Sequence, residues 1–140
     1  MVPLWSLGGA LVGWFRKQAK GRLRYVDGTY IKLHQHGLQG SALTREKEAV
    51  GLSRGGMTTK CLAWVDKLGL LCDFTLHVGN YHDLTAARQS LEAFRGSHFV
   101  GDKGFDSQAF REELSEHGAV DSTIPRKGCQ TLREQPKPFK

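Results

Sequence analysis

The spacing of apolar residues changes once along the chain, and this change limits the folds available to it. Before residue 80, segments rich in apolar and β-branched residues predict three strands, at 23–30 or 23–33, 58–65 and 70–78. The last two are joined by the tight turn DKLG and form a hairpin. From Asp83 onward, apolar residues recur at intervals of three and four up to Phe94. This spacing predicts an amphipathic helix with Asp83 as its N-cap.

The rest of the chain continues with alternating strands and helices. SHFVGD predicts a short buried strand, DSQAFREELSEHG a second helix closed by Gly118, and AVDSTIP a last strand stopped by Pro125. The order is therefore β-β-β-α-β-α-β, which belongs to the α/β class of layered folds. A chain of 140 residues is long enough for one domain with one core.

Positive charge is concentrated near the two ends of the chain. The formal net charge is +6, and half of the 20 Lys and Arg residues lie in 16–24 and 126–140. The stretch between, 25–125, has 10 basic and 13 acidic residues, so its own balance is 10 − 13 = −3. A slightly acidic body with basic flanks fits a metal centre approached by a phosphate backbone. Solubilising charge at two loose ends explains the same pattern equally well.

Cysteine usage and the N-terminal segment bear on the compartment. Three cysteines form no CxxC pair and leave an odd one in any disulfide scheme, which favours a reducing compartment. The first 15 residues are apolar, but a membrane span needs about 20. Their positive charges follow the apolar run, which is the wrong order for a secretory signal. Nothing else in the chain predicts a membrane segment.

Two aspartates stand at positions that strands do not normally favour. Asp27 and Asp102 are 102 − 27 = 75 residues apart; each lies at an apolar strand and is followed within two residues by glycine. If the first and fourth strands are parallel neighbours, a spacing of about 4.8 Å brings both carboxylates to one edge of the sheet. Converging carboxylates hold Mg²⁺, a hard ion that takes oxygen ligands. Taken singly, an Asp before Gly is usually a turn residue.

The glycine-rich loop GLSRGGMTTK, residues 51–60, has part of the pattern of a phosphate-binding loop. Gly51 and Gly56 have the spacing of the first two P-loop glycines, but Met57 stands where the lysine is required. The loop is therefore interpreted as a turn that presents Arg54 and Lys60 to a polyanion, or simply as a mobile surface loop.

The histidines give weaker signals. His34 and His36 lie on one face if they are in a strand, but a zinc ion would need two further ligands that the sequence does not place. His82 precedes Asp83, and a local hydrogen-bonding role is its simplest interpretation.

Several segments, in order, resemble one family. YVDGTYIKLHQHG, GLSRGGMTTK, WVDKLGLLCDFTLHVGNYHDLTAA, GDKGFDS and IPRKG are similar to the catalytic domain of DDE transposases of bacterial insertion sequences. The resemblance covers about residues 23–128. It implies an RNase H-like fold, a mixed sheet of strand order 3-2-1-4-5 flanked by helices, with Asp27 and Asp102 as catalytic ligands of Mg²⁺ or Mn²⁺. The implied activity is DNA transposition by cleavage and joining of DNA strands.

The resemblance also implies partners and further site residues. The partner is double-stranded DNA, both element ends and target, and the chain could assemble as a homo-oligomer. The implied location is the cytoplasm of a bacterium, at the nucleoid. His82 and Asp83 would support the site, and the residues implied in DNA contact are Arg54, Lys60, Lys103, Arg126 and Lys127.

The sequence departs from the family pattern at both ends. The family's third acid lies on a helix beyond the IP segment, and here Glu134 is followed by prolines in REQPKPFK, which disfavour a helix. Glu112, Glu113 and Glu116 are better explained as the solvated face of the preceding helix. We therefore expect 1–22 to be a poorly matched leader, 23–128 a partial catalytic domain lacking the last helix, and 129–140 a basic tail. Such a chain is expected to be inactive alone and to expose part of an apolar sheet face.

Two alternatives stay open at this point. VDGT and GDKGFD also suggest a haloacid-dehalogenase-like phosphatase, but Tyr25 occupies the position of the nucleophilic aspartate and cannot form an aspartyl-phosphate. The other alternative is a non-catalytic DNA-binding remnant, or a regulator of a full-length transposase, which the basic flanks and the incomplete acid set would both suit.

Overall fold

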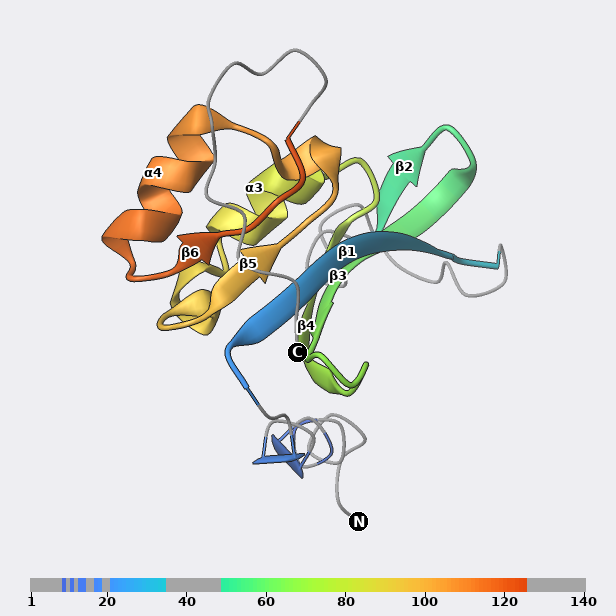
Figure 1. Ribbon diagram of the computed structural model, residues 1–140. Helices are drawn as coiled ribbons and strands as arrows, with labels where there is room; N and C mark the ends of the chain where they lie inside the picture. Colours follow the sequence, from blue (N-terminus) through green and yellow to red (C-terminus); the bar gives the residue numbers. More distant parts are fainter. Residues whose placement is uncertain are drawn as a thin grey trace.

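The computed structural model describes residues 21–34 and 49–125, together with residues 9, 11, 13, 14, 17 and 18 near the N-terminus. The centre of the domain is one mixed sheet (Figure 1). Its strands are β1 (Leu23–Lys32), β2 (Gly51–Ser53), β3 (Gly56–Val65), β4 (Leu71–Val78), β5 (His98–Val100) and β6 (Val120–Asp121).

The strand order confirms the predicted topology. β3 pairs antiparallel with β1 on one side and with β4 on the other, while β5 is parallel to β1 and β6 is parallel to β5. With β2 set aside, the order across the sheet is β4-β3-β1-β5-β6, which is the 3-2-1-4-5 order of an RNase H-like sheet.

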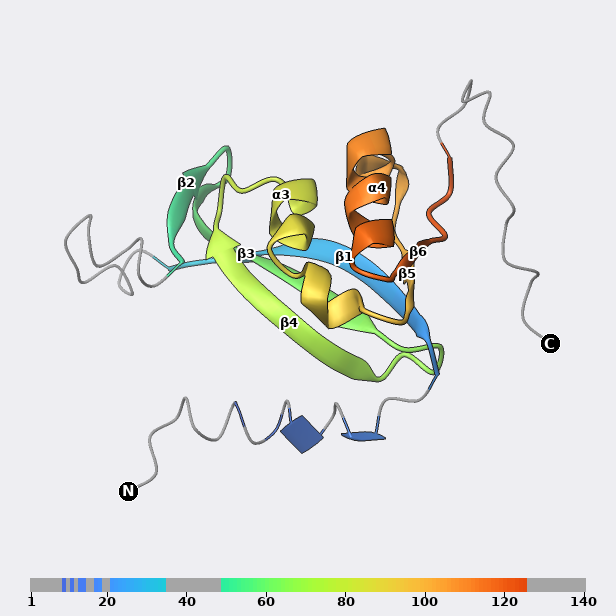
Figure 2. The ribbon, with the colours of Figure 1, turned by 90° about the vertical axis from the view of Figure 1, so that its left-hand side faces the viewer.

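The helices described here pack on one face of the sheet. Figure 2 shows α3 (Asp83–Arg88) and α4 (Gln108–Glu116) on the same side. Beneath them lies a core of aromatic rings in edge-to-face contact, in which Phe99 meets Phe94, Phe105 and Phe110 at centroid distances of 5.0, 5.4 and 5.2 Å. Such pairs add about 0.5–1.5 kcal/mol each beyond the area they bury. This packing fixes β5, and with it Asp102, against the rest of the domain.

The opposite face of the sheet carries apolar side chains that no described helix covers. Ile31, Phe74, Leu76 and Val120 are 49, 37, 47 and 53 % exposed. They alternate along their strands with residues that face the helices, such as Asp73 opposite Trp64. The exposed apolar face expected from the sequence is therefore present in the described part of the chain.

Three local predictions are corrected. The helix expected from Asp83 to Phe94 breaks after α3, and a 3₁₀ turn, η2 (Leu91–Phe94), follows Ser90, whose hydroxyl donates to the carbonyl of Ala86. The N-cap of α3 is His82, not Asp83, because the Asp83 side chain is engaged elsewhere.

The glycine-rich segment 51–60 is a hairpin of β2 and β3 in place of a loop. Its turn is closed by the Ser53 hydroxyl, which donates to the Gly56 carbonyl at 3.0 Å. Gly56 has a φ of 101°, a conformation that favours glycine.

The second predicted helix is confirmed with standard ends. Ser107 caps α4 by accepting a hydrogen bond from the Phe110 amide, and Gly118 follows it with a φ of 73°. None of the described helices has the length and apolar character needed to traverse a bilayer.

Candidate metal and DNA site

Asp27 and Asp102 are brought level with each other by the parallel pairing of β1 and β5. The paired residues are Leu23 with His98, Arg24 with Phe99 and Tyr25 with Val100, a constant offset of 75. The same offset relates Asp27 to Asp102, two positions beyond the last paired residues. Neighbouring strands lie about 4.8 Å apart, so the two backbones lie side by side if this register continues past Val100, where β5 ends.

The neighbours of each aspartate indicate that both side chains point to the uncovered face. Val26 is buried in the core beneath the helices, and Asp27 follows it on an extended strand. A Cβ on Gly101 would lie 2.6 Å from the Phe105 ring and 2.9 Å from that of Phe99, so position 101 faces the core. Asp102 is also extended, two residues beyond the end of β5; if the alternation of strand residues continues to it, its side chain points away from the core as that of Asp27 does.

Each carboxylate is exposed and accepts a hydrogen bond through Oδ1, which leaves Oδ2 for a metal ion. Oδ1 of Asp27 accepts from the Gly28 amide and Oδ1 of Asp102 accepts from the Gly104 amide, both at 2.8 Å. Neither acid forms an ion pair with any described residue. Two exposed, cation-free carboxylates at one sheet edge fit a hard divalent cation that keeps several waters. In residues 21–34 and 49–125, no three His, Cys, Asp or Glu side chains converge as a complete metal cage.

A buried ion pair lies directly beneath Gly28. Lys60 Nζ is 2.6 Å from Asp83 Oδ1, and the two side chains are 2 and 39 % exposed. The same ammonium lies 4.0 Å from the centroid of the Tyr30 ring. A Cβ on Gly28 would overlap the Asp83 carboxylate and lie 2.9 Å from Lys60 Cε, so only glycine leaves room for the pair.

The positive charge of Lys60 is stabilised by its partners. Burial disfavours the ammonium, but the hydrogen bond and negative charge of Asp83, helped by Tyr30, outweigh that effect and raise the pKa of Lys60. The pair ties the first residue of α3 to β3, directly against Gly28 of β1, which follows Asp27. The supporting role of Asp83 stays a prediction; its contact with Lys60 was not predicted from the sequence.

The predicted DNA-contacting residues are distributed unevenly. Arg54 lies exposed in the turn of the β2–β3 hairpin, and Lys103 is exposed next to Asp102. Lys60 is the exception, because its side chain points into the domain and is paired with Asp83; the expectation that it is presented at the surface is not met. His34 is exposed at the end of β1. His36, Arg126, Lys127, Glu134 and the segment 129–140 lie outside the described residues, as does most of 1–22.

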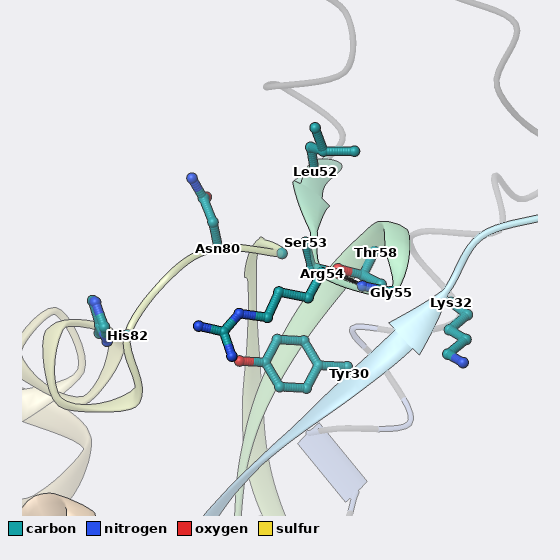
Figure 3. Close-up of a pocket in the computed structure, with 10 residues that line it drawn as sticks. Tyr30, Lys32, Leu52, Ser53, Arg54, Gly55, Thr58, Asn80 and His82 are labelled. Atoms are coloured by element: carbon teal, nitrogen blue, oxygen red, sulfur yellow. Dashed lines mark hydrogen bonds between the residues drawn. The ribbon is translucent and has the colours of Figure 1, made fainter.

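A groove beside the hairpin contains residues that the sequence reasoning missed. Tyr30 and Lys32 from β1 line it together with Arg54 and Asn80 (Figure 3). The signal was present in the strand pattern, because Tyr30 and Lys32 are two apart and share one face of β1. His82 closes the groove at the start of α3 and also lines a second hollow with Asp83 and Gly104, beside Asp102.

Comparison with known proteins identifies the family. The family model described as "Transposase DDE domain" matches residues 18–138. The chain belongs to the transposase DDE domain family. The assignment of Asp27 and Asp102 as the metal ligands of this DDE domain stays a prediction. A search of curated proteins finds no match.

Solved structures extend the likeness to the fold. The DDE domain is similar to a piggyBac transposase in a synaptic complex with hairpin DNA, with a TM-score of 0.56 and 12 % identity over 96 % of this chain and 31 % of that one. A Mos1 mariner paired-end complex with Mn matches with a TM-score of 0.46 and 15 % identity, over 84 % of this chain and 40 % of that one. The likeness to piggyBac shows a shared RNase H-like fold. The chain spans about a third of the length of that transposase.

Proposed function

We propose that this DDE domain acts in DNA transposition, with Asp27 and Asp102 as ligands of the divalent cations that cleave and join DNA strands. The observation that supports the proposal is the β1–β5 register, whose offset of 75 would make the two aspartates neighbours if it continues two residues past the last paired positions. Mg²⁺, or Mn²⁺ in its place, would bind the two carboxylates and activate water or a 3′-hydroxyl toward a phosphodiester. Double-stranded DNA is the proposed substrate.

The surroundings of the acids support a polyanionic substrate. Lys103 is adjacent to Asp102, and Arg54 extends from the hairpin on the same side as the groove (Figure 3). Arg126 and Lys127 remain proposed DNA contacts from the sequence alone.

The direct test of the proposal is metal binding. Titration of Mn²⁺, followed by the electron paramagnetic resonance signal of the free ion, is expected to show a site that weakens in Asp27→Asn and in Asp102→Asn. Each variant is expected to lose at least about tenfold in Mn²⁺ affinity, because losing even a residue that only hydrogen-bonds to a metal ligand costs that much. Glu116→Gln is the matched control, because it removes one exposed carboxylate from α4 and is expected to leave the affinity unchanged. Equal affinity in all four proteins would refute the site.

A nicking assay separates binding from turnover. With supercoiled plasmid and Mg²⁺, we expect the 140-residue chain to bind the metal without cutting DNA, because a complete set of acids is not assembled among the described residues. Cutting that disappears in Asp27→Asn would overturn the expectation of inactivity and strengthen the assignment.

An enzyme of this kind would work at the nucleoid of a bacterial cytoplasm, and assembly into a homo-oligomer is part of the proposal.

A further inference from the structure

The groove beside the hairpin has the chemistry of a nucleotide site. Its volume is about 870 Å³, and it is open to solvent along the free part of β1. Lys32 and Arg54 contribute two cations, and none of the described residues that line the groove is acidic. The body of the chain, 25–125, has a balance of −3, so this surface has the opposite sign to its surroundings. The groove is therefore complementary to an anion.

Tyr30 gives the groove a fixed aromatic platform. The residue is 54 % exposed, although Lys60 Nζ lies 4.0 Å from its ring centroid. Lys60 is itself held by Asp83, so one side of the ring rests on a buried ion pair and the exposed side is presented in a set orientation. Bases stack on platforms of this kind without regard to sequence.

The groove and a second hollow share one lining residue. His82 lines both the groove and the second hollow of about 350 Å³, where Gly104 adjoins Asp102. Along β1, Tyr30 is three residues beyond Asp27, which corresponds to about 10 Å at roughly 3.3 Å per residue. That distance equals about three nucleotide steps at a rise of ~3.4 Å, or fewer in an extended strand. One DNA strand can thus reach both places.

The direction of the side chains favours a single strand over a duplex. Tyr30 pairs across the sheet with buried Lys60 and so faces the helices, whereas Asp27 points to the uncovered side. A strand joining them must cross the edge of β1, and β5 ends at Val100, so it pairs with β1 only up to Tyr25. Duplex DNA has a persistence length of about 150 base pairs and cannot bend within so short a distance, whereas a single strand can.

We propose that this groove binds an unpaired nucleotide of the DNA strand whose phosphodiester lies at Asp27 and Asp102. The base stacks on the exposed face of Tyr30, and the flanking phosphates contact Arg54 and Lys32. Asn80 offers an amide to the base edge. The inference rests on the proposed function, because the position of the acids defines which strand enters the groove.

Binding of short oligonucleotides tests the groove without any cleavage. A fluorescent single-stranded oligonucleotide is expected to bind more tightly than the same sequence as a blunt duplex. Tyr30→Ala and Arg54→Ala are each expected to weaken single-strand binding roughly tenfold, within the range for loss of one base stack. Lys67→Ala, which removes an exposed cation from the β3–β4 turn, is the matched control and should change binding by less than about twofold.

Two further measurements keep the test decisive. Tyr30→Ala also removes the ring that contacts Lys60, so Tyr30→Phe, which keeps the ring, is the second variant and should bind the single strand as the unmodified chain does. The fluorescence of 2-aminopurine in the oligonucleotide should be quenched on binding to Tyr30→Phe but not to Tyr30→Ala. Blunt duplex bound as tightly as single strand, or equal effects of Arg54→Ala and Lys67→Ala, would overturn the proposal. If Mn²⁺ binding still depends on Asp27 and Asp102 while the groove variants have no effect, the groove fails and the proposed function stands. If Mn²⁺ binding is independent of both acids, the proposed function fails, and with it the assignment of the strand.

Discussion

Replacing either residue of the buried Lys60–Asp83 ion pair is expected to lower the free energy of unfolding, and by a larger amount for Asp83 than for Lys60. Asp83→Asn leaves an ammonium whose side chain is 2 % exposed without its counter-charge. Lys60→Met leaves a carboxylate whose Oδ1 is buried but whose side chain as a whole is 39 % exposed, so it can turn toward water. Breaking a fully buried pair costs about 3–5 kcal/mol, and breaking an exposed pair costs about 0–1 kcal/mol. We therefore expect losses of about 2 kcal/mol for Asp83→Asn and about 1 kcal/mol for Lys60→Met.

Urea unfolding followed by circular dichroism measures both losses, and the double variant closes a thermodynamic cycle. The double variant is expected to be more stable than Asp83→Asn alone, because it no longer buries an unpaired charge. The reasoning is refuted if Asp83→Asn costs no more than Lys60→Met, since that result would mean that the ammonium of Lys60 reaches water.

Three other predictions concern the surroundings of the site. Gly28→Ala should cost about 1–3 kcal/mol in the free energy of unfolding, because its Cβ would displace the Asp83 carboxylate, and the cost should shrink in an Asp83→Ala background. Burial lowers the pKa of His77, so the folded state favours the neutral ring. The contribution of the neutral ring to stability is complete above about pH 6.5 and is lost as the pH falls through the lowered pKa. His77→Gln should remove this loss from the pH dependence of unfolding. Ser107→Ala should cost about 0.5–1 kcal/mol in the free energy of unfolding, because it removes the N-cap of α4, whose hydrogen bond to the Phe110 amide is long at 3.5 Å. Ser115→Ala, on the exposed side of α4, should be nearly neutral in the same measurement.

The main strands and α4 were predictable because their signals are local. β1, β3 and β4 are long enough for β-branched and apolar residues to dominate, and α4 has a serine cap and a terminal glycine within one short segment. The parallel pairing of β1 with β5 cannot be derived from periodicity. It came from the family resemblance, and the observed offset of 75 agrees with it.

The parts that sequence reasoning missed depend on contacts between distant residues. Lys60 sits in a strand where a lysine is expected to reach solvent, and only the approach of Asp83 from α3 makes its burial possible. The same contact removes Asp83 from the capping role that its position predicted. The groove at Tyr30 is formed by three segments far apart in the chain, so none of them carries its signal alone.

The central claim is that Asp27 and Asp102 share one cation. Nuclear magnetic resonance of the labelled chain during a Mn²⁺ titration tests it most directly, since a bound paramagnetic ion broadens the signals of nearby amides. We expect the amide signals of Gly28 and Gly104 to broaden together with one midpoint, while the signal of Gly69 in the distant β3–β4 turn stays sharp. Broadening at only one of the two, or at both with separate midpoints, would contradict a shared metal site.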